Sequence, residues 1–175
     1  MLLRDAVAMF EGSDLAAAGP TRWADLGCGS GRFTLALAER LAPGSIIHAM
    51  DRDARALARI DTDHRNARIQ THRGDFTKQP WPFTDLDGIL MANSLHYIEH
   101  RHAFIRECQP RLRRSHRFLI VEYDTDKANP WVPYPLSQNA LADLFRDAGY
   151  TSFRTLGSRP SLYHRAPLYA ALVTT

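Results

Sequence analysis

Three glycines follow an acidic residue in the segment Asp25-Leu26-Gly27-Cys28-Gly29-Ser30-Gly31. Glycine allows the backbone to turn tightly and to approach a ligand closely, and a helix that begins near Ser30 would direct its N-terminal amide groups toward the same place. The glycine spacing is GxGxG, whereas the dinucleotide fingerprint is GxGxxG with the helix N-terminus facing a pyrophosphate. The segment therefore predicts a nucleotide-type site, and its spacing argues against a nicotinamide dehydrogenase.

Acidic residues also recur near the ends of successive apolar segments. Asp25 stands at the end of the first predicted strand, Asp51 at the end of the second, and Asp75 just beyond the third. A carboxylate at Asp51 could accept both hydroxyl groups of a ribose, and one at Asp75 could accept from the amine of an adenine. Phe76 would add an apolar wall, so these residues together describe an adenosine-shaped pocket.

The elements that must position these residues follow from the pattern of apolar residues. Strands are predicted at residues 21–26, 45–50, 68–71, 86–92, 117–123, 151–156 and 168–173, and helices at residues 2–10, 30–41, 53–61, 98–108 and 137–148. No helix-length segment separates the last two strands, so they should pair as an antiparallel hairpin. The sequence predicts one α/β domain over residues 1–175, with a doubly wound, mostly parallel seven-stranded sheet. Ligands of such sheets bind at the carboxyl ends of the strands.

Composition narrows the class of protein further. A chain of 175 residues fits one domain, and no apolar run approaches the roughly 18 residues of a membrane span. The N-terminal residues do not resemble a signal peptide, so a cytoplasmic protein without a membrane partner is expected. Cys28 and Cys108 show neither a CxxC nor a metal-ligand spacing, which predicts two reduced thiols and no metal site.

The net charge of +3 permits contact with phosphates but does not require it. The densest basic cluster consists of Arg111, Arg113, Arg114, His116 and Arg117. It falls between a helix and the following strand, where we expect a solvated loop at the amino-terminal edge of the sheet. Because that edge faces away from the predicted ligand site, nucleic acid is not expected as a partner.

Four segments together resemble the class I S-adenosylmethionine-dependent methyltransferases. They are the segment from Asp25 to Gly31, Asp51-Arg52-Asp53, Gly74-Asp75-Phe76, and Met91-Ala92-Asn93-Ser94-Leu95-His96-Tyr97. They occur in the family's order, and the resemblance extends from about residue 21 to the C-terminus because the terminal hairpin also matches. The resemblance implies a Rossmann-like methyltransferase fold and S-adenosylmethionine as the cofactor.

The resemblance also assigns residues to the two ends of that cofactor. At the methionine end it places a loop with its supporting acid and a nearby amide, namely Gly27, Cys28, Gly29, Gly31, Asp25 and Asn93. At the other end, Asp51 would bind the ribose and Arg52 would flank the adenine. Asp75 and Phe76 would contact the adenine edge.

Methyl transfer from a sulfonium needs little covalent help from a protein, which must align the acceptor and exclude water. A general base is needed only for an acceptor that must lose a proton. The candidates are His96, Tyr97, Glu122 and Asp124, which all follow the fourth or fifth strand. His96 is the best placed as a catalytic residue, because an imidazole titrates near neutral pH.

The segment Asn93-Ser94-Leu95-His96 also bears on the acceptor. Family members that methylate bases or glutamine amides carry an Asn/Asp-Pro-Pro-aromatic run there, so this chain is more similar to the small-molecule branch. We therefore predict methyl transfer to an oxygen or nitrogen of a small-molecule acceptor. The alternative is a non-catalytic, S-adenosylmethionine-binding regulatory or accessory protein.

Little sequence is available to cap the acceptor side of this predicted site. About twenty residues precede the first strand, and no large insertion follows a later one, so a second subunit in a homodimer could complete the pocket. The best local lid is residues 124–136, where Trp131 and Tyr134 stand among prolines. That loop could instead pack on the sheet edge, and Tyr163 and His164 allow the same two interpretations.

Overall fold

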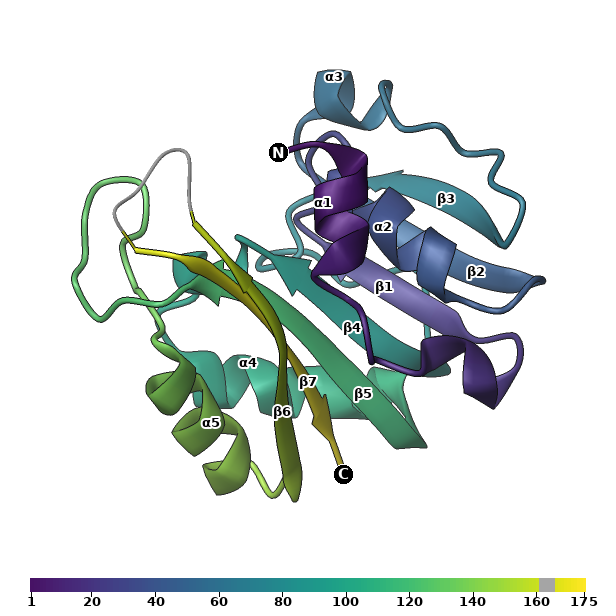
Figure 1. Cartoon of the computed structure of the whole chain (residues 1–175). Helices are drawn as coiled ribbons and strands as arrows, with labels where there is room; N and C mark the ends of the chain where they lie inside the picture. The colour runs from purple at the N-terminus through teal and green to yellow at the C-terminus, as the bar shows by residue number, and fades with distance from the viewer. Residues whose placement is uncertain (161–165) are drawn as a thin grey trace.

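The computed structural model describes residues 1–160 and 166–175, and in this part of the chain seven strands form one sheet (Figure 1). The strands are β1 (Arg22–Leu26), β2 (Ser45–Asp51), β3 (Ala67–Arg73), β4 (Leu86–Ala92), β5 (Leu112–Tyr123), β6 (Ser152–Arg159) and β7 (Leu168–Thr174). Their order across the sheet is β3-β2-β1-β4-β5-β7-β6. Strands β1 to β5 run parallel, whereas β7 pairs antiparallel with both β5 and β6. The predicted doubly wound sheet with an antiparallel C-terminal hairpin is confirmed.

Helices cover both faces of this sheet. The helices α1 (Leu3–Ala8), α2 (Arg32–Arg40) and α3 (Ala54–Leu57) contribute to one apolar core, and α4 (Arg101–Cys108) and α5 (Gln138–Asp147) contribute to the other. In Figure 1, α1 and α2 lie on the opposite side of the sheet from α4. Because the central strands are buried on both faces, they are apolar almost without interruption, as in residues 118–121 of β5.

The chain reverses its winding direction between β1 and β4. Strands β2 and β3 extend the sheet on one side of β1, and β4 and β5 extend it on the other. A crevice forms outside the carboxyl ends of the strands at such a switch point, and ligands of doubly wound sheets bind there. The fold therefore brings the residues after β1, β2, β3 and β4 to one end of the molecule.

All five helices are shorter than the sequence predicts, and α3 loses the most residues. Helix α3 ends at Leu57 because the next amides, those of Arg59 and Ile60, bond to carbonyls three residues earlier, which tightens the chain into turns. Asp53 caps the N-terminus of α3, since its carboxylate accepts from the amides at positions 55 and 56. Helix α4 begins at Arg101, because residues 95–97 form a short 3₁₀ turn, η2 (Leu95–Tyr97), before it.

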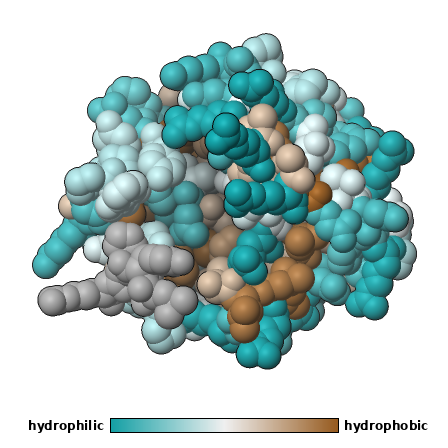
Figure 2. Space-filling model, turned by 90° about the horizontal axis from the view of Figure 1, so that it is seen from above, coloured by the Kyte–Doolittle hydropathy of each residue, from teal (hydrophilic) through white to brown (hydrophobic). Residues whose placement is uncertain are grey.

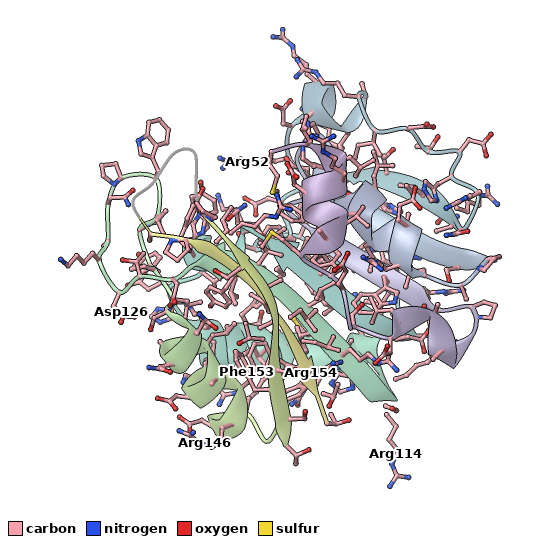
Figure 3. The ribbon with its side chains drawn as sticks, viewed as in Figure 1. Arg52, Arg114, Asp126, Arg146, Phe153 and Arg154 are labelled. Carbon is pink, nitrogen blue, oxygen red and sulfur yellow. The ribbon has the colours of Figure 1, made fainter. Side chains whose placement is uncertain are left out.

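The basic cluster lies mostly in strand β5, and Arg111 ends a short 3₁₀ helix, η3 (Gln109–Arg111), so the prediction of a loop over residues 111–117 is wrong. Strand β5 begins at Leu112, where its first residue pairs with Leu86 of β4 across a register shift. Within the strand, the guanidinium of Arg113 lies 3.1 Å from the Asp87 carboxylate. Figure 3 shows Arg114 at the end of the sheet away from Arg52, which agrees with the predicted amino-terminal edge.

Within the described residues, no helix combines the length and the apolar character that crossing a bilayer requires. Tyr163 and His164, for which the sequence leaves two roles open, lie outside the residues that the structure describes.

Candidate cofactor cleft

The loop after β1 is held in place by the end of β2. The amides of Gly27 and Cys28 donate to the Met50 carbonyl at 2.8 and 3.1 Å, and the amide of Gly31 donates back to the Cys28 carbonyl at 3.0 Å. All three loop glycines have positive φ, between +54° and +80°. L-residues rarely adopt this region, so the glycines are required by the backbone itself.

Two of these positions also lack room for a side chain. A Cβ at Gly27 would lie 2.7 Å from the Cβ of Ser94, and one at Gly31 would lie 2.7 Å from Cγ1 of Ile60. A Cβ at Gly29 would meet no atom within 4 Å. The first and third glycines therefore pack the loop against its neighbours, and the second faces open space in the cleft.

The Asp51 carboxylate connects this loop to the N-terminus of α3. Its Oδ2 accepts from the Gly29 amide at 2.7 Å, and its Oδ1 accepts from the Asp53 amide at 2.9 Å. Each carboxylate oxygen has a second lone pair, and the residue is half-buried in the wall of the cleft. The geometry leaves Asp51 able to accept two further hydrogen bonds from a ligand.

Asp25 lies beneath the loop, fully buried, and is absent from the lining of the cleft. Its Oδ2 accepts from the Thr34 hydroxyl of α2 at 2.6 Å, and its Oδ1 has no partner. Burial raises the pKa of this carboxyl to about 7, the Thr34 hydroxyl opposes the rise, and the charge of Asp51 adds to it. The structure therefore places Asp25 beneath the loop, bonded to α2 and away from the cleft.

Asp75 and its neighbours form the opposite wall. The amide and the hydroxyl of Thr77 donate to Asp75 Oδ1 at 3.0 and 2.6 Å, and the Lys78 ammonium lies 3.7 Å from Oδ2. The Thr77 hydroxyl contributes most to the lowered pKa of Asp75, and nearby charges of Lys78 and Arg52 add to it. The aromatic ring of Phe76 completes this wall.

The turn after β4 closes the cleft near the glycine loop. Asn93 has a φ of +53°, its amide donates to the Val121 carbonyl at 2.8 Å, and its side-chain Oδ1 is buried without a partner. The Ser94 hydroxyl donates to the Leu26 carbonyl at 2.6 Å, which ties the turn to the end of β1. A buried amide oxygen without a donor suits a ligand that brings one.

Together these walls enclose a cleft of about 570 Å³. Seven of the predicted cofactor residues line it, namely Gly27, Gly29, Asp51, Arg52, Asp75, Phe76 and Asn93. Figure 3 shows Arg52 above the carboxyl end of the sheet, and Figure 2 shows exposed apolar surface among hydrophilic side chains at this end. The predicted residues Asp25, Cys28, Gly31 and His96 do not line the cleft.

Seven further residues line the cleft without having been predicted as cofactor residues, namely Asp53, Ala56, Gly74, Thr77, Lys78, Ser94 and Tyr97. Each stands within five residues of a predicted one, so the motifs give the right segments. The positions of these seven residues in the sequence form no recognisable motif. Which of them face the cleft depends on how the chain turns at Asp51, Asp75 and Asn93.

His96, the predicted base, is 2% exposed and contacts a second buried residue. Its Nδ1 lies 2.6 Å from Oε2 of Glu122, and its backbone amide donates to Oε1 of Glu122 at 3.1 Å. The neighbouring Tyr97 is 55% exposed, lines the cleft, and has its ring centre 4.4 Å from that of His96. His96 therefore lies directly behind the wall that Tyr97 presents.

The predicted lid, residues 124–136, is anchored at its C-terminal end. The Tyr134 amide donates to the His96 carbonyl at 3.0 Å, and the Arg101 guanidinium donates to the carbonyls of Tyr134 and Pro135. In contrast, Trp131 is 74% exposed. Hence the loop is bonded to the molecule at both ends, since the Asp124 amide also donates to the Pro167 carbonyl at 2.9 Å, and it presents an indole ring to solvent between them.

The cysteines and the acidic residues form no alternative reactive centre in the part of the chain that the structure describes. Burial raises the pKa of both thiols, those of Cys28 and Cys108, so neither is a thiolate nucleophile. No group of three or more His, Cys, Asp or Glu side chains within these residues is arranged to hold a metal ion.

Comparisons with known proteins agree with this geometry. A family model described as "Methyltransferase domain" matches residues 24–115, more than half of the chain. No sequence among the curated proteins matches.

Solved structures share the fold at low sequence identity. An S-adenosylmethionine-dependent methyltransferase from Archaeoglobus fulgidus has a TM-score of 0.72 at 13% identity, over 99% of this chain and 95% of that one. The 1,6-didemethyltoxoflavin-N1-methyltransferase of Burkholderia thailandensis, solved with 1,6-didemethyltoxoflavin and S-adenosylhomocysteine, has a TM-score of 0.68 at 20% identity, over 99% and 77% of the two chains. A corresponding enzyme from Aquifex aeolicus has a TM-score of 0.62 at 15% identity, over 99% and 98%.

Proposed function

This chain belongs to the methyltransferase domain family, and we propose that it transfers a methyl group from S-adenosylmethionine to an oxygen or nitrogen atom of a small-molecule acceptor. The observation that carries the proposal is the cleft itself. It joins a glycine loop, a carboxylate with free lone pairs at Asp51, and a polar wall with an aromatic ring at residues 75–78.

The residues of the cleft fit this cofactor. Asp51 would hold the ribose hydroxyls, Asp75 and Phe76 the adenine, and Gly29 leaves space for close approach to the backbone. The unpartnered Oδ1 of Asn93 would accept from the ammonium group of the methionine part. When bound, the cofactor supplies a methyl group already activated by a positively charged sulfur.

The part of the protein in the reaction is to orient the acceptor, exclude water and remove a proton where the acceptor has one to lose. We assign the last role to His96, because the centre of its ring lies 4.4 Å from that of Tyr97, which lines the cleft together with Asn93. Tyr97 and the lid residue Trp131 would face the acceptor, and the run Asn93-Ser94-Leu95-His96 supports the small-molecule class. A second copy of the chain could cover the same side, which sedimentation of the protein with S-adenosylhomocysteine would test.

Calorimetric titration tests the cofactor assignment, and product analysis tests the reaction. We expect S-adenosylmethionine and S-adenosylhomocysteine to bind and NADH not to bind. S-adenosylhomocysteine should be released with acceptors from a panel of small phenols, carboxylates and amines. The variant His96→Gln should keep its affinity for S-adenosylhomocysteine and lose turnover. Failure to bind either sulfur compound would refute the proposal.

One observation favours the alternative of a non-catalytic, cofactor-binding protein. The imidazole of His96 is almost completely buried, and its Nδ1 is engaged by Glu122. Such a protein would bind S-adenosylmethionine as tightly as the enzyme would and release no product with any acceptor of the panel. The two functions are therefore separated by turnover and not by affinity.

A further inference from the structure

We propose that Glu122 is a positioning residue, which fixes the tautomer and the orientation of His96 so that Nε2 serves the acceptor. The inference rests on the proposed function, in which His96 removes the acceptor's proton. It adds a residue that touches neither the cleft nor the acceptor, since Glu122 is 1% exposed on β5 and does not line the cleft.

Glu122 contacts His96 at two points, one on the backbone and one on the ring. Oε1 accepts from the His96 amide at 3.1 Å, and Oε2 contacts Nδ1 at 2.6 Å. A single contact would allow the ring to rotate, whereas two contacts to the same carboxylate fix the position of the turn and the direction of the imidazole together.

The contact to Oε2 assigns the ring proton. A carboxylate oxygen accepts hydrogen bonds, so in the neutral imidazole the proton stays on Nδ1 and the lone pair is on Nε2. No described residue forms a hydrogen bond with Nε2. Nε2 is also absent from the fully buried polar atoms that have no partner. The basic nitrogen is therefore the one that no described residue engages.

A positive charge compensates the buried carboxylate of Glu122. The Arg101 guanidinium is half-buried, and its attraction to Glu122 partly offsets the burial that lowers the pKa of Arg101. The same guanidinium donates to the carbonyls of Tyr134 and Pro135, so the cluster also holds the lid. Glu122 thus has one competing role, in which its contact with His96 only stabilises the loop.

In the proposed step, the acceptor's oxygen or nitrogen forms its bond to the methyl carbon while the carbon–sulfur bond breaks and its electron pair remains on sulfur. The proton that the acceptor loses passes to Nε2 of His96. The resulting imidazolium carries a proton on each nitrogen, and the Glu122 carboxylate stabilises it through Nδ1. The imidazolium later releases its new proton to water.

The tautomer can be measured without an acceptor. Protein labelled with ¹⁵N-histidine and saturated with S-adenosylhomocysteine is compared with His96→Gln, which identifies the His96 signals. We expect the proton on Nδ1 in the wild type. In Glu122→Gln, the side chain has one acceptor oxygen instead of two, and its amide NH₂ can donate to Nδ1. The ring proton should then move from Nδ1 to Nε2, so the Nε2 signal should shift toward its protonated position. A wild-type proton on Nε2, or unchanged His96 signals in Glu122→Gln, would overturn the proposal.

Glu39→Gln is the matched control, because it changes a second histidine–carboxylate contact, 3.3 Å from His64, away from the cleft. It should alter the His64 signals and leave those of His96 unchanged.

With any acceptor that the panel identifies, Glu122→Gln should lower kcat roughly 10- to 100-fold at unchanged affinity for S-adenosylhomocysteine. A raised acceptor KM with an unchanged kcat would show that Glu122 only holds the lid. If the wild type does not bind S-adenosylhomocysteine, the proposed function is refuted. The histidine spectrum of the unliganded protein would still test whether Glu122 fixes the His96 tautomer.

Discussion

Replacing Asp51 with alanine tests the assignment of the cleft most directly. The carboxylate already accepts from two amides, at 2.7 Å from Gly29 and 2.9 Å from Asp53, and offers one further lone pair on each oxygen to a ligand. A hydrogen bond to a charged group contributes about 1.5–3 kcal/mol. Losing two ribose contacts should therefore cost about 3–6 kcal/mol, which corresponds to a roughly 10²- to 10⁴-fold higher Kd for S-adenosylhomocysteine.

The protein should remain folded, because water can reach the two amides once the half-exposed carboxylate is gone. We expect a loss of about 1–2 kcal/mol in unfolding free energy, and a Tm lower by roughly 2–4 °C for each kcal/mol. Titration calorimetry measures Kd, and circular dichroism measures Tm. Asp61→Ala is the matched control, since Asp61 makes the same local bond to the amide two residues on, at 3.1 Å, outside the cleft. An unchanged Kd in folded Asp51→Ala would refute the ribose role.

Three further substitutions probe the loop, the buried acid and the core. Gly27→Ala should weaken S-adenosylhomocysteine binding by about tenfold or more, because its Cβ would lie 2.7 Å from that of Ser94 in a left-handed backbone; calorimetry measures this. The pKa of Asp25 is raised to about 7, so the folded protein keeps a proton that the unfolded chain releases above about pH 4. Between about pH 4 and about pH 7, the unfolding free energy of the wild type should therefore fall by about 4 kcal/mol more than that of Asp25→Asn. Urea titrations at several pH values measure both. Gly88→Ala should lower the unfolding free energy by about 1–3 kcal/mol, because its Cβ would lie 2.5 Å from the buried Trp23 ring; thermal denaturation measures this.

Each of these has an outcome that would contradict it. Gly19 has a φ of +74° and nothing within 4 Å of its Cβ, so equal losses in Gly19→Ala and Gly27→Ala would show that backbone strain, and not the contact with Ser94, determines binding. Parallel stability curves for the wild type and Asp25→Asn would mean that Asp25 ionises normally. A Gly88→Ala protein of unchanged Tm would show that the Trp23 ring shifts freely.

The fold was predictable because the elements that build it have strong local signals. Short apolar runs such as residues 89–92 and 118–121 favour buried strands, and the glycines and acids near other strand ends mark where the strands stop. The segments that line the cleft were predictable for the same reason, since positive φ at Gly27 or Asn93 is a property of the local chain. The weak predictions concern lengths, as in α3, whose apolar pattern continues after its hydrogen bonds have changed to turns.

The pairing of His96 with Glu122 could not be read from the sequence. Both residues were candidate bases, because both follow a central strand, but 26 positions separate them. Only the register of β4 against β5, which brings Ala92 beside Val121, decides that they meet. Burial of Asp25 behind the loop is equally a tertiary effect, because a strand residue may face either helix layer.

The strand order divides the molecule into two blocks that meet at β4. The chain up to that strand supplies most of the cleft wall, whereas β5, the lid and the hairpin lie on the other side. The family match ends at residue 115, before the lid begins. Substitutions in the lid, such as at Trp131, therefore leave the shared glycine loop untouched. A change in the lid and a change in the glycine loop thus fall in different parts of the chain, on different sides of β4.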